Sequence, residues 1–250
     1  MPCGAGVRFR SAVPSTRQGA PWAVGVEAKE KAFIMLKRLN VLIVATLTAL
    51  TAGCLQKETT QTMYLAPDGS VSWVVSESNV RSDETDGAKR LTEEQEYIAE
   101  AMLGTHGTAR GLAALGPLGA VRTAVLRAER PFHVVTSAEF AAADQVLQRV
   151  FTEMAIGTSA SFVRDGDEDT LRVTLDFSHP LEEHETPVSE LIGSFERFRL
   201  VLTEGRIANT SGLDVMDGTS ATLSDQWLER AERAYEAKSS IEFSLSWRVR

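Results

Sequence analysis

The sequence has almost no cysteine, with Cys3 and Cys54 as the two examples in 250 residues. A disulfide, a thiolate zinc cluster and a cysteine nucleophile are therefore excluded after residue 54. Basic charge is also scarce there. Residues 54–250 carry 19 Lys and Arg against 32 Asp and Glu, a net charge of −13, whereas residues 1–53 carry seven against two. So acidic a region lacks the positive surface of a nucleic-acid binder, and we expect no nucleic-acid partner.

The common catalytic motifs are missing as well. The chain contains no Gly-x-Ser-x-Gly, no Gly-x-x-x-x-Gly-Lys phosphate loop and no Ser-x-x-Lys set in a recognisable context. We therefore predict no cofactor and name no catalytic residue. Residues far apart in the sequence can still form a triad in space, so an envelope enzyme with an unrecognised active site remains the alternative.

No apolar run is long enough to cross a bilayer, which takes about 20 residues. Residues 41–50 form the most apolar run. It follows the basic pair Lys37-Arg38 and ends in small residues before Cys54. This order of a basic, an apolar and a small-residue segment is typical of an export signal. A buried helix or a marginal membrane anchor would not explain the small residues and the lone cysteine.

Ala52-Gly53-Cys54 resembles the lipobox of bacterial lipoproteins, although Thr51 departs from the usual aliphatic residue and Leu50 lies one position further out. The resemblance implies cleavage between Gly53 and Cys54. Cys54 would then carry a diacylglyceryl thioether and usually a third, amide-linked chain. Several acyl chains anchor a protein stably where one does not. A lipid-anchored domain outside the cytoplasm, in the cell envelope, is therefore expected, with the membrane as its first partner.

The sequence then divides into four parts. We expect residues 1–34 to be a disordered extension or a mis-assigned start, because a signal peptide normally begins at its basic segment, here at Met35. Residues 35–53 are the predicted signal peptide. Residues 54–60 are a polar tether, at most about 20 Å long when extended. Residues 61–250 form a single domain.

Alternating apolar and polar residues predict strands that each bury one face. The clear examples are 61–66 and 70–77 around the Pro67-Asp68-Gly69 turn, 170–177, 197–202 and 241–250, and weaker ones are 121–127, 132–136, 158–163 and 219–223. Helical spacing predicts helices over 93–103, 138–155, 187–192 and from Ser224 or Asp225 to about 238. A Thr92-x-x-Gln95 capping box would open the first of these helices. The expected fold is α+β, an antiparallel sheet with helices packed on one face.

Three stretches invite a functional interpretation. Residues 165–169 are acidic at alternate positions, but Thr170 replaces the glycine of a calcium loop, so a hairpin tip is expected. Residues 179–185 hold two histidines five positions apart, which does not match a helical zinc motif, and we predict no metal site. Residues 104–119 hold five glycines among leucines, which favours a frayed connection over a lipid-facing or partner-facing segment.

One further pattern concerns arginines at the polar positions of the predicted strands. They are Arg172, Arg197, Arg199, Arg248 and Arg250. If their strands are neighbours, they form a stripe that could bind an anionic ligand or an acidic protein partner through bidentate contacts. Cross-strand pairing with Asp176, Glu196 and Glu242 is the favoured alternative. The sequence as a whole indicates a lipid-anchored envelope lipoprotein whose domain binds or scaffolds a ligand that it does not identify.

Overall fold

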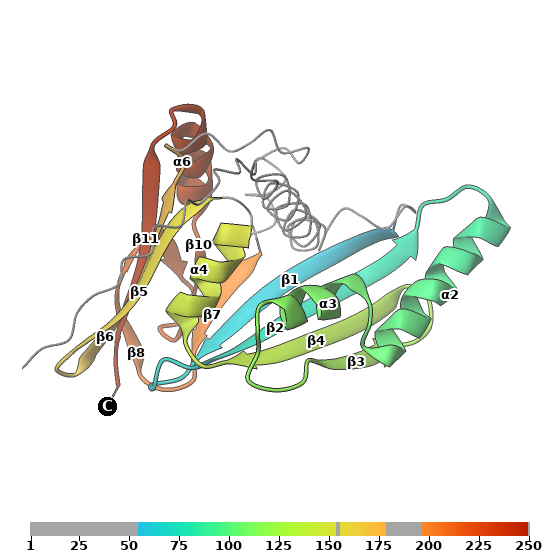
Figure 1. The fold of residues 1–250 in the computed structure, drawn as a ribbon, viewed down its shortest axis with the longest axis horizontal. Coiled ribbons are helices and arrows are strands. Elements are labelled where there is room, and N and C mark those ends of the chain that lie inside the picture. Colours follow the sequence, from blue (N-terminus) through green and yellow to red (C-terminus); the bar gives the residue numbers. More distant parts are fainter. Residues whose placement is uncertain (1–54, 154–155, 179–196, 250) are drawn as a thin grey trace, which may run out of the picture. The chain divides into compact units, whose positions relative to one another are not determined.

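The computed structural model describes residues 55–153, 156–178 and 197–249, which form strands and helices in the order shown in Figure 1. The strands are β1 (Leu55–Leu65), β2 (Val71–Ser82), β3 (Arg122–Arg127), β4 (Phe132–Phe140), β5 (Gly157–Asp165), β6 (Glu168–Asp176), β7 (Phe198–Leu202), β8 (Arg206–Ser211), β9 (Leu213–Val215), β10 (Ser220–Leu223) and β11 (Ser240–Arg248). The helices are α2 (Gly87–Leu103), α3 (Gly107–Ala114), α4 (Ala143–Glu153) and α6 (Asp225–Glu236). The predicted α+β class is confirmed.

The strands belong to two sheets. One, sheet A, has the order β3-β4-β2-β1-β7-β10-β9, and the other, sheet B, has the order β5-β6-β11-β8. The pairings are antiparallel except for that of β1 with β7, which is parallel. The sequence had predicted one antiparallel sheet. Strand periodicity shows which face of a strand is buried, but it does not show which strands pair.

The buried faces follow the predicted alternation. Phe198, Leu200 and Leu202 of β7 are buried, as are alternate residues of β6 and β11. These side chains share one core with Trp73, Phe140 and the apolar residues of α4 and α6. A separate small cluster lies under α2 and consists of Val80, Tyr97, Ala101 and Val134. Both sheets therefore have one buried face.

The β1–β2 hairpin shows how local sequence sets the geometry. Gly69 has φ of +86°, which L-residues avoid, and the Asp68 carboxylate accepts a bond from the Ser70 backbone N–H at 2.9 Å. Further along β2 the pairing register shifts between Glu77 and Val80, at Asn79 with φ of +53°. This bulge changes the parity of the strand, so that Val80 and Ser82 still face inward.

Several predicted boundaries are wrong. The expected tether at 55–60 is the first half of β1, because these residues pair with β2. α2 begins six residues before the predicted capping box: Asp86 is its N-cap, and the Thr92 hydroxyl donates to the Ala88 carbonyl instead. The helix predicted from residue 138 starts at Ala143, because β4 continues to Phe140, which pairs with Val71. Residues 107–114 of the glycine-rich stretch are the helix α3.

Other local predictions are confirmed. Ser224 is the N-cap of α6, and its hydroxyl accepts a bond from the Trp227 backbone N–H at 3.1 Å. Residues 165–168 form the tip of the β5–β6 hairpin, as expected of the acidic stretch. The predictions for residues 1–54, the histidine stretch 179–185, the helix 187–192 and Arg250 lie outside the described residues. None of the helices in the described ranges is both long and apolar enough to cross a membrane.

Candidate functional site

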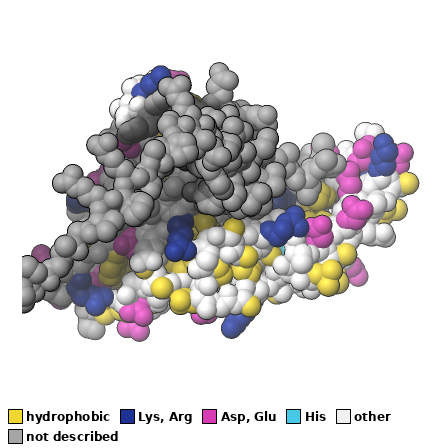
Figure 2. All heavy atoms as spheres, viewed as in Figure 1, with side chains coloured by type: hydrophobic (Ala, Val, Ile, Leu, Met, Phe, Trp, Pro, Cys, Tyr) yellow, Lys and Arg dark blue, Asp and Glu magenta, His cyan; other side chains and the backbone are white. Residues whose placement is uncertain are grey.

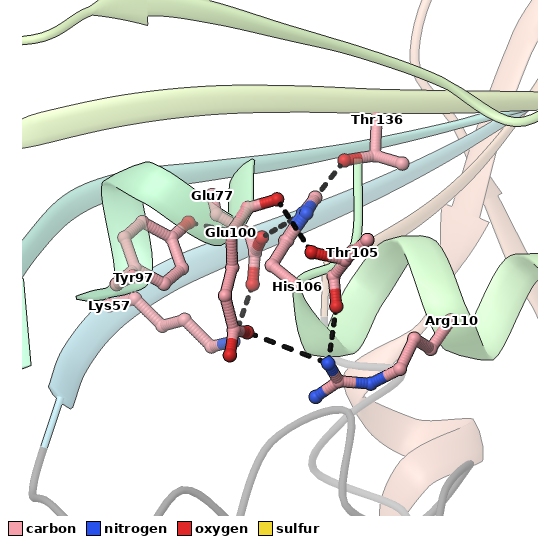
Figure 3. Close-up of polar contacts among 8 residues, drawn as sticks. All are labelled: Lys57, Glu77, Tyr97, Glu100, Thr105, His106, Arg110 and Thr136. Carbon is pink, nitrogen blue, oxygen red and sulfur yellow. Dashed lines mark hydrogen bonds and ion pairs between the residues drawn. The ribbon is translucent and has the colours of Figure 1, made fainter. Parts of the chain in front are cut away.

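A group of titratable side chains surrounds Glu77 of β2 (Figure 3). Val71, Trp73, Val75 and Glu77 alternate on the buried face of the strand, so the carboxylate occupies a core position. The side chain of Glu77 is 1% exposed. An isolated carboxylate there would be strongly destabilising, so its partners decide whether the fold tolerates it.

Three side chains from three different elements satisfy Glu77. Lys57 of β1 forms an ion pair and a hydrogen bond with Oε1. The Tyr97 hydroxyl of α2 donates to Oε2 over 3.2 Å. His106, the residue before α3, places Nε2 3.4 Å from the same oxygen. We call these four residues together with Thr136 the Glu77 cluster.

The connection between α2 and α3 positions His106. Gly104 ends α2 with φ of +67°, and its N–H donates to carbonyls of the last helical turn, which turns the chain back toward the sheet. His106 is 1% exposed, and its Nε2 lies 3.0 Å from the Thr136 hydroxyl of β4. The Tyr97 ring meets the imidazole edge-on with centroids 6.0 Å apart. Nδ1 has no hydrogen-bond partner among the described residues.

The environment fixes the ionisation states of two of these groups. Burial raises the pKa of Glu77, but the hydrogen bond from His106 and the charge and hydrogen bond of Lys57 outweigh it and lower the pKa from 4.5 to about 2. Burial, followed by the Glu77 charge and hydrogen bond, raises the pKa of Tyr97 above its ordinary value. Glu77 is therefore an anion at neutral pH, and Tyr97 remains a neutral donor.

The cluster is better suited to fastening elements together than to proton transfer. A carboxylate with so low a pKa is a weak general base at neutral pH. A second set of contacts joins the two helices next to the Glu77 cluster. Arg110 of α3 pairs with Glu100 of α2 at 3.5 Å and donates to the Thr105 carbonyl. Because Glu77 bonds to β1 and α2 and contacts the residue that opens α3, it links both helices to the neighbouring strands β1 and β2 in the middle of sheet A.

A second buried carboxylate fastens the middle of α2. Glu94 is 3% exposed and accepts from the Ser82 backbone N–H at 3.0 Å. Arg130, beyond the end of β3, pairs with the same oxygen at 3.0 Å. The Glu93 carboxylate accepts from the Ser82 hydroxyl. α2 is thus fixed to the sheet at two points along its length.

The arginine stripe does not form as a single surface. Arg197 and Arg199 lie on β7 or next to it in sheet A, whereas Arg172 and Arg248 lie in sheet B. Three of these arginines have carboxylate partners: Arg172 pairs with Glu242 at 3.4 Å, Arg197 with Glu58 at 3.4 Å and Arg248 with Glu168 at 3.2 Å. Arg199 is exposed and has no ion pair within the described part of the chain. The favoured alternative named Glu242 as a cross-strand partner, and Arg172 pairs with it. Arg248 also pairs across strands, but with Glu168, which the prediction did not name.

Two further kinds of site can be checked on the described surface. Among the described residues, no group of three or more histidine, cysteine and acidic side chains has a geometry that could hold a metal ion. A shallow pocket lies on α4, lined by Gln145, Gln148, Arg149 and Thr152. Arg149 is already used there, because it donates to the Leu115 carbonyl at 2.7 Å. No residue of the Glu77 cluster lines this pocket.

Sequence reasoning missed the Glu77 cluster, although one signal was present. Glu77 continues the apolar alternation of Val71, Trp73 and Val75, so its carboxylate was bound to point inward. A charged residue at a core position implies a buried partner. Its partners come from residues 57, 97 and 106, in elements whose packing no local pattern predicts.

Comparison with known proteins gives little further information. No family model matches the chain, and no curated protein matches its sequence. Among solved structures, the chain is similar to the folded domain of the LppM protein of Mycobacterium tuberculosis, determined by NMR. The identity is 11% and the TM-score 0.34, over 81% of this chain and 94% of that one. So low a score supports no conclusion about function.

Proposed function

We propose that this protein is a lipoprotein anchored in the cell envelope through Cys54, and that its domain binds or scaffolds a partner at the membrane surface. The order of a basic segment, an apolar segment and Ala52-Gly53-Cys54 is the observation that carries the proposal. The alternative is an envelope enzyme with an unrecognised active site.

The position of β1 is compatible with this anchor. Leu55 pairs with Ser82, so the residue after Cys54 already belongs to sheet A. Every described element follows Cys54, and cleavage before it would remove none of them. The acyl chains would then be attached directly to the end of a strand, and the domain would lie against the bilayer.

The burial of the Glu77 cluster argues against its use as an active site. An active site combines an open pocket with convergent titratable groups. Here Glu77 and His106 are each 1% exposed, and the pocket on α4 is lined by amide, hydroxyl and guanidinium groups. The outer face of sheet B is accessible instead. It carries the ion pairs Arg172–Glu242 and Arg248–Glu168 together with short hydroxyl side chains, Ser159, Ser161, Thr170, Thr174, Ser244 and Ser246.

Replacing the lipidated residue tests the anchor. Cys54→Ala leaves residues 55–250 without any acylation site of this kind, because no other cysteine follows. The wild-type protein should incorporate radiolabelled palmitate and float with membranes, and the variant should do neither. Cys3→Ala is the matched control and should label like the wild type. Equal labelling of wild type and Cys54→Ala would overturn the proposal.

A further inference from the structure

Sheet B ends in a strand, β5, whose outer edge has no backbone partner within the described residues. β5 is the first strand of the sheet and pairs with β6 on its other side. That pairing runs through all nine residues from Gly157 to Asp165 without a register shift. The backbone N–H and C=O groups along an open edge of this kind are able to pair with another strand.

The other edge strands are protected in ways that β5 is not. β3 has an arginine at each end, Arg122 and Arg127, and an irregular pairing with β4. β9 has three residues. β8 is partly covered, because the Ile207 N–H donates to the Gly218 carbonyl at 2.9 Å. Charge, irregular pairing, shortness and cover all keep edge strands from associating, and β5 has none of them before Arg164.

The first seven residues of β5, Gly157 to Val163, are uncharged. They are glycine, alanine, serine, threonine, phenylalanine and valine. Charged side chains gather elsewhere, for example at the start of α2, where Figure 2 shows acidic and basic groups together at the right of the molecule. A second strand therefore meets no like charge along this part of β5, although the domain as a whole is acidic.

Side-chain contacts hold β5 in place as a strand. The Phe162 ring lies against the Trp247 ring of β11, with the two centroids 5.6 Å apart. Near the end of the strand, Arg164 pairs with the buried Asp169 of β6 at 2.8 Å. A strand that is already ordered loses little conformational entropy when another strand pairs with it.

We propose that β5 pairs antiparallel with β5 of a second copy of this chain, about a two-fold axis at Ser161. A two-fold contact joins identical surfaces, so the strand must be complementary to itself. Placing the axis at Ser161 pairs all nine residues, with Gly157 opposite Asp165 and Thr158 opposite Arg164. Each charged residue thus faces an uncharged one.

The inner face of β5 favours the same register. Ala160 and Phe162 pack against the main core but are only partly buried. In the proposed register each Ala160 lies opposite the partner subunit's Phe162, so that a small side chain leaves room for a large one. Pairing would bury more apolar surface of both residues. Sheet B would then continue from one copy into the other.

Spin labels test the pairing by distance. Ser161, Arg172, Ser244 and Ser211 lie opposite one another in turn across sheet B, so Ser211 is three strands away from Ser161. The full chain carries Cys3→Ala, Cys54→Ala and one new cysteine at an exposed position, either Ser161→Cys or Ser211→Cys. Labels at 161 would lie on adjacent strands. Labels at 211 would lie seven strand spacings apart, about 34 Å.

We expect spectral broadening from close labels at position 161 and a dipolar distance of about 34 Å at position 211. A chain that shows no interaction between labels at either position up to about 1 mM would overturn the proposal. A close distance at 211 without broadening at 161 would place the contact on another surface and would overturn it as well.

Charge variants in the same background test the register. Ser159 lies opposite the partner subunit's Val163 in the proposed register, and both side chains are exposed. Ser159→Lys with Val163→Lys opposes two pairs of lysines and should weaken the dimer about tenfold. Ser159→Glu with Val163→Lys places opposite charges at the same positions and should restore dimerisation. The matched control, Gln226→Lys with Ala237→Lys, adds two exposed lysines at α6 and should dimerise like the unaltered chain.

Sedimentation over a concentration series measures these effects. All four positions are exposed, so unchanged unfolding midpoints are expected as a check of the fold. A dimer that the lysine pair at 159 and 163 does not weaken uses another surface, and equal weakening by both charge patterns would refute the register. The spin-label distances decide the matter if a charge variant is unstable. Because every sample lacks Cys54, these results do not depend on the proposed lipid anchor, and neither proposal falls with the other.

Discussion

The Glu77 cluster should contribute several kilocalories to the stability of the domain, and Glu77→Gln measures this. The amide removes the charge that Lys57 and His106 face in the wild type. Removing one partner of a buried ion pair costs roughly 3–5 kcal/mol, because the other charge stays buried. The Lys57 side chain is 18% exposed and thus partly hydrated, which favours the lower end of that range.

The pKa shift of Glu77 gives a second value for the contribution of this carboxylate to the free energy of unfolding. The pKa of Glu77 is about 2 in the folded protein against an ordinary 4.5. A lowered folded pKa means that the contribution is fully present above the ordinary pKa and is lost as the pH falls toward the folded one. At 1.36 kcal/mol per pKa unit, the difference corresponds to about 3 kcal/mol.

Urea unfolding of both proteins over a series of pH values is the assay. The wild type should be more stable than Glu77→Gln by about 3 kcal/mol at neutral pH. This gap in unfolding free energy between the two proteins should become smaller as the pH falls below about 4.5. Glu100→Gln is the control, because Glu100 pairs with Arg110 on the exposed surface and should cost at most about 1 kcal/mol. A gap that stays constant down to about pH 2.5 would refute the electrostatic argument. A gap below about 1 kcal/mol at neutral pH would refute the role of the cluster.

Three further predictions concern the core, a helix end and the start of the chain. Leu245→Ala should cost roughly 2–5 kcal/mol in urea unfolding, and the exposed Arg199→Ala at most about 1 kcal/mol; similar losses would mean that the predicted faces are wrong. Ser224→Ala should cost about 1 kcal/mol through the lost cap of α6, and Ser224→Gly less; equal stability to the wild type would show that the cap contributes nothing. A chain that starts at Met35 should give the same mature mass as the full sequence, and a heavier product from the full sequence would place the signal elsewhere.

The sequence predicted burial better than pairing. Alternation in β7 and β11 identified Phe198, Leu200, Phe243 and Leu245 as core residues, because each strand has one buried face. The same alternation assigned Arg199 and Arg248 to a common surface, although β7 and β11 belong to different sheets. A period of two carries no information about the neighbouring strand, so the arginine stripe could not be tested from sequence.

The helix boundaries were misplaced where residues fit two patterns. Phe140 matches the helical spacing of Val146, Leu147 and Phe151, but it also continues the alternation of β4. Pairing with Val71 decides in favour of the strand, and that pairing depends on a segment about 70 residues earlier. The edge strands β8 and β9 were missed for different reasons. Arg206–Ser211 has few apolar residues, and Leu213–Val215 is too short to show a period of two.

The Glu77 cluster and the proposed anchor concern the same few residues of β1. Leu55 packs against the apolar cluster under α2, and Lys57, at the register shift between Gln56 and Glu58, reaches Glu77. The residues that follow Cys54 are thus tied to β2, α2 and the segment that opens α3. In the proposed lipoprotein, this arrangement replaces a flexible stalk with a rigid joint, because any rotation of β1 must carry α2 with it. The acyl chains would then be attached to a strand that moves together with α2.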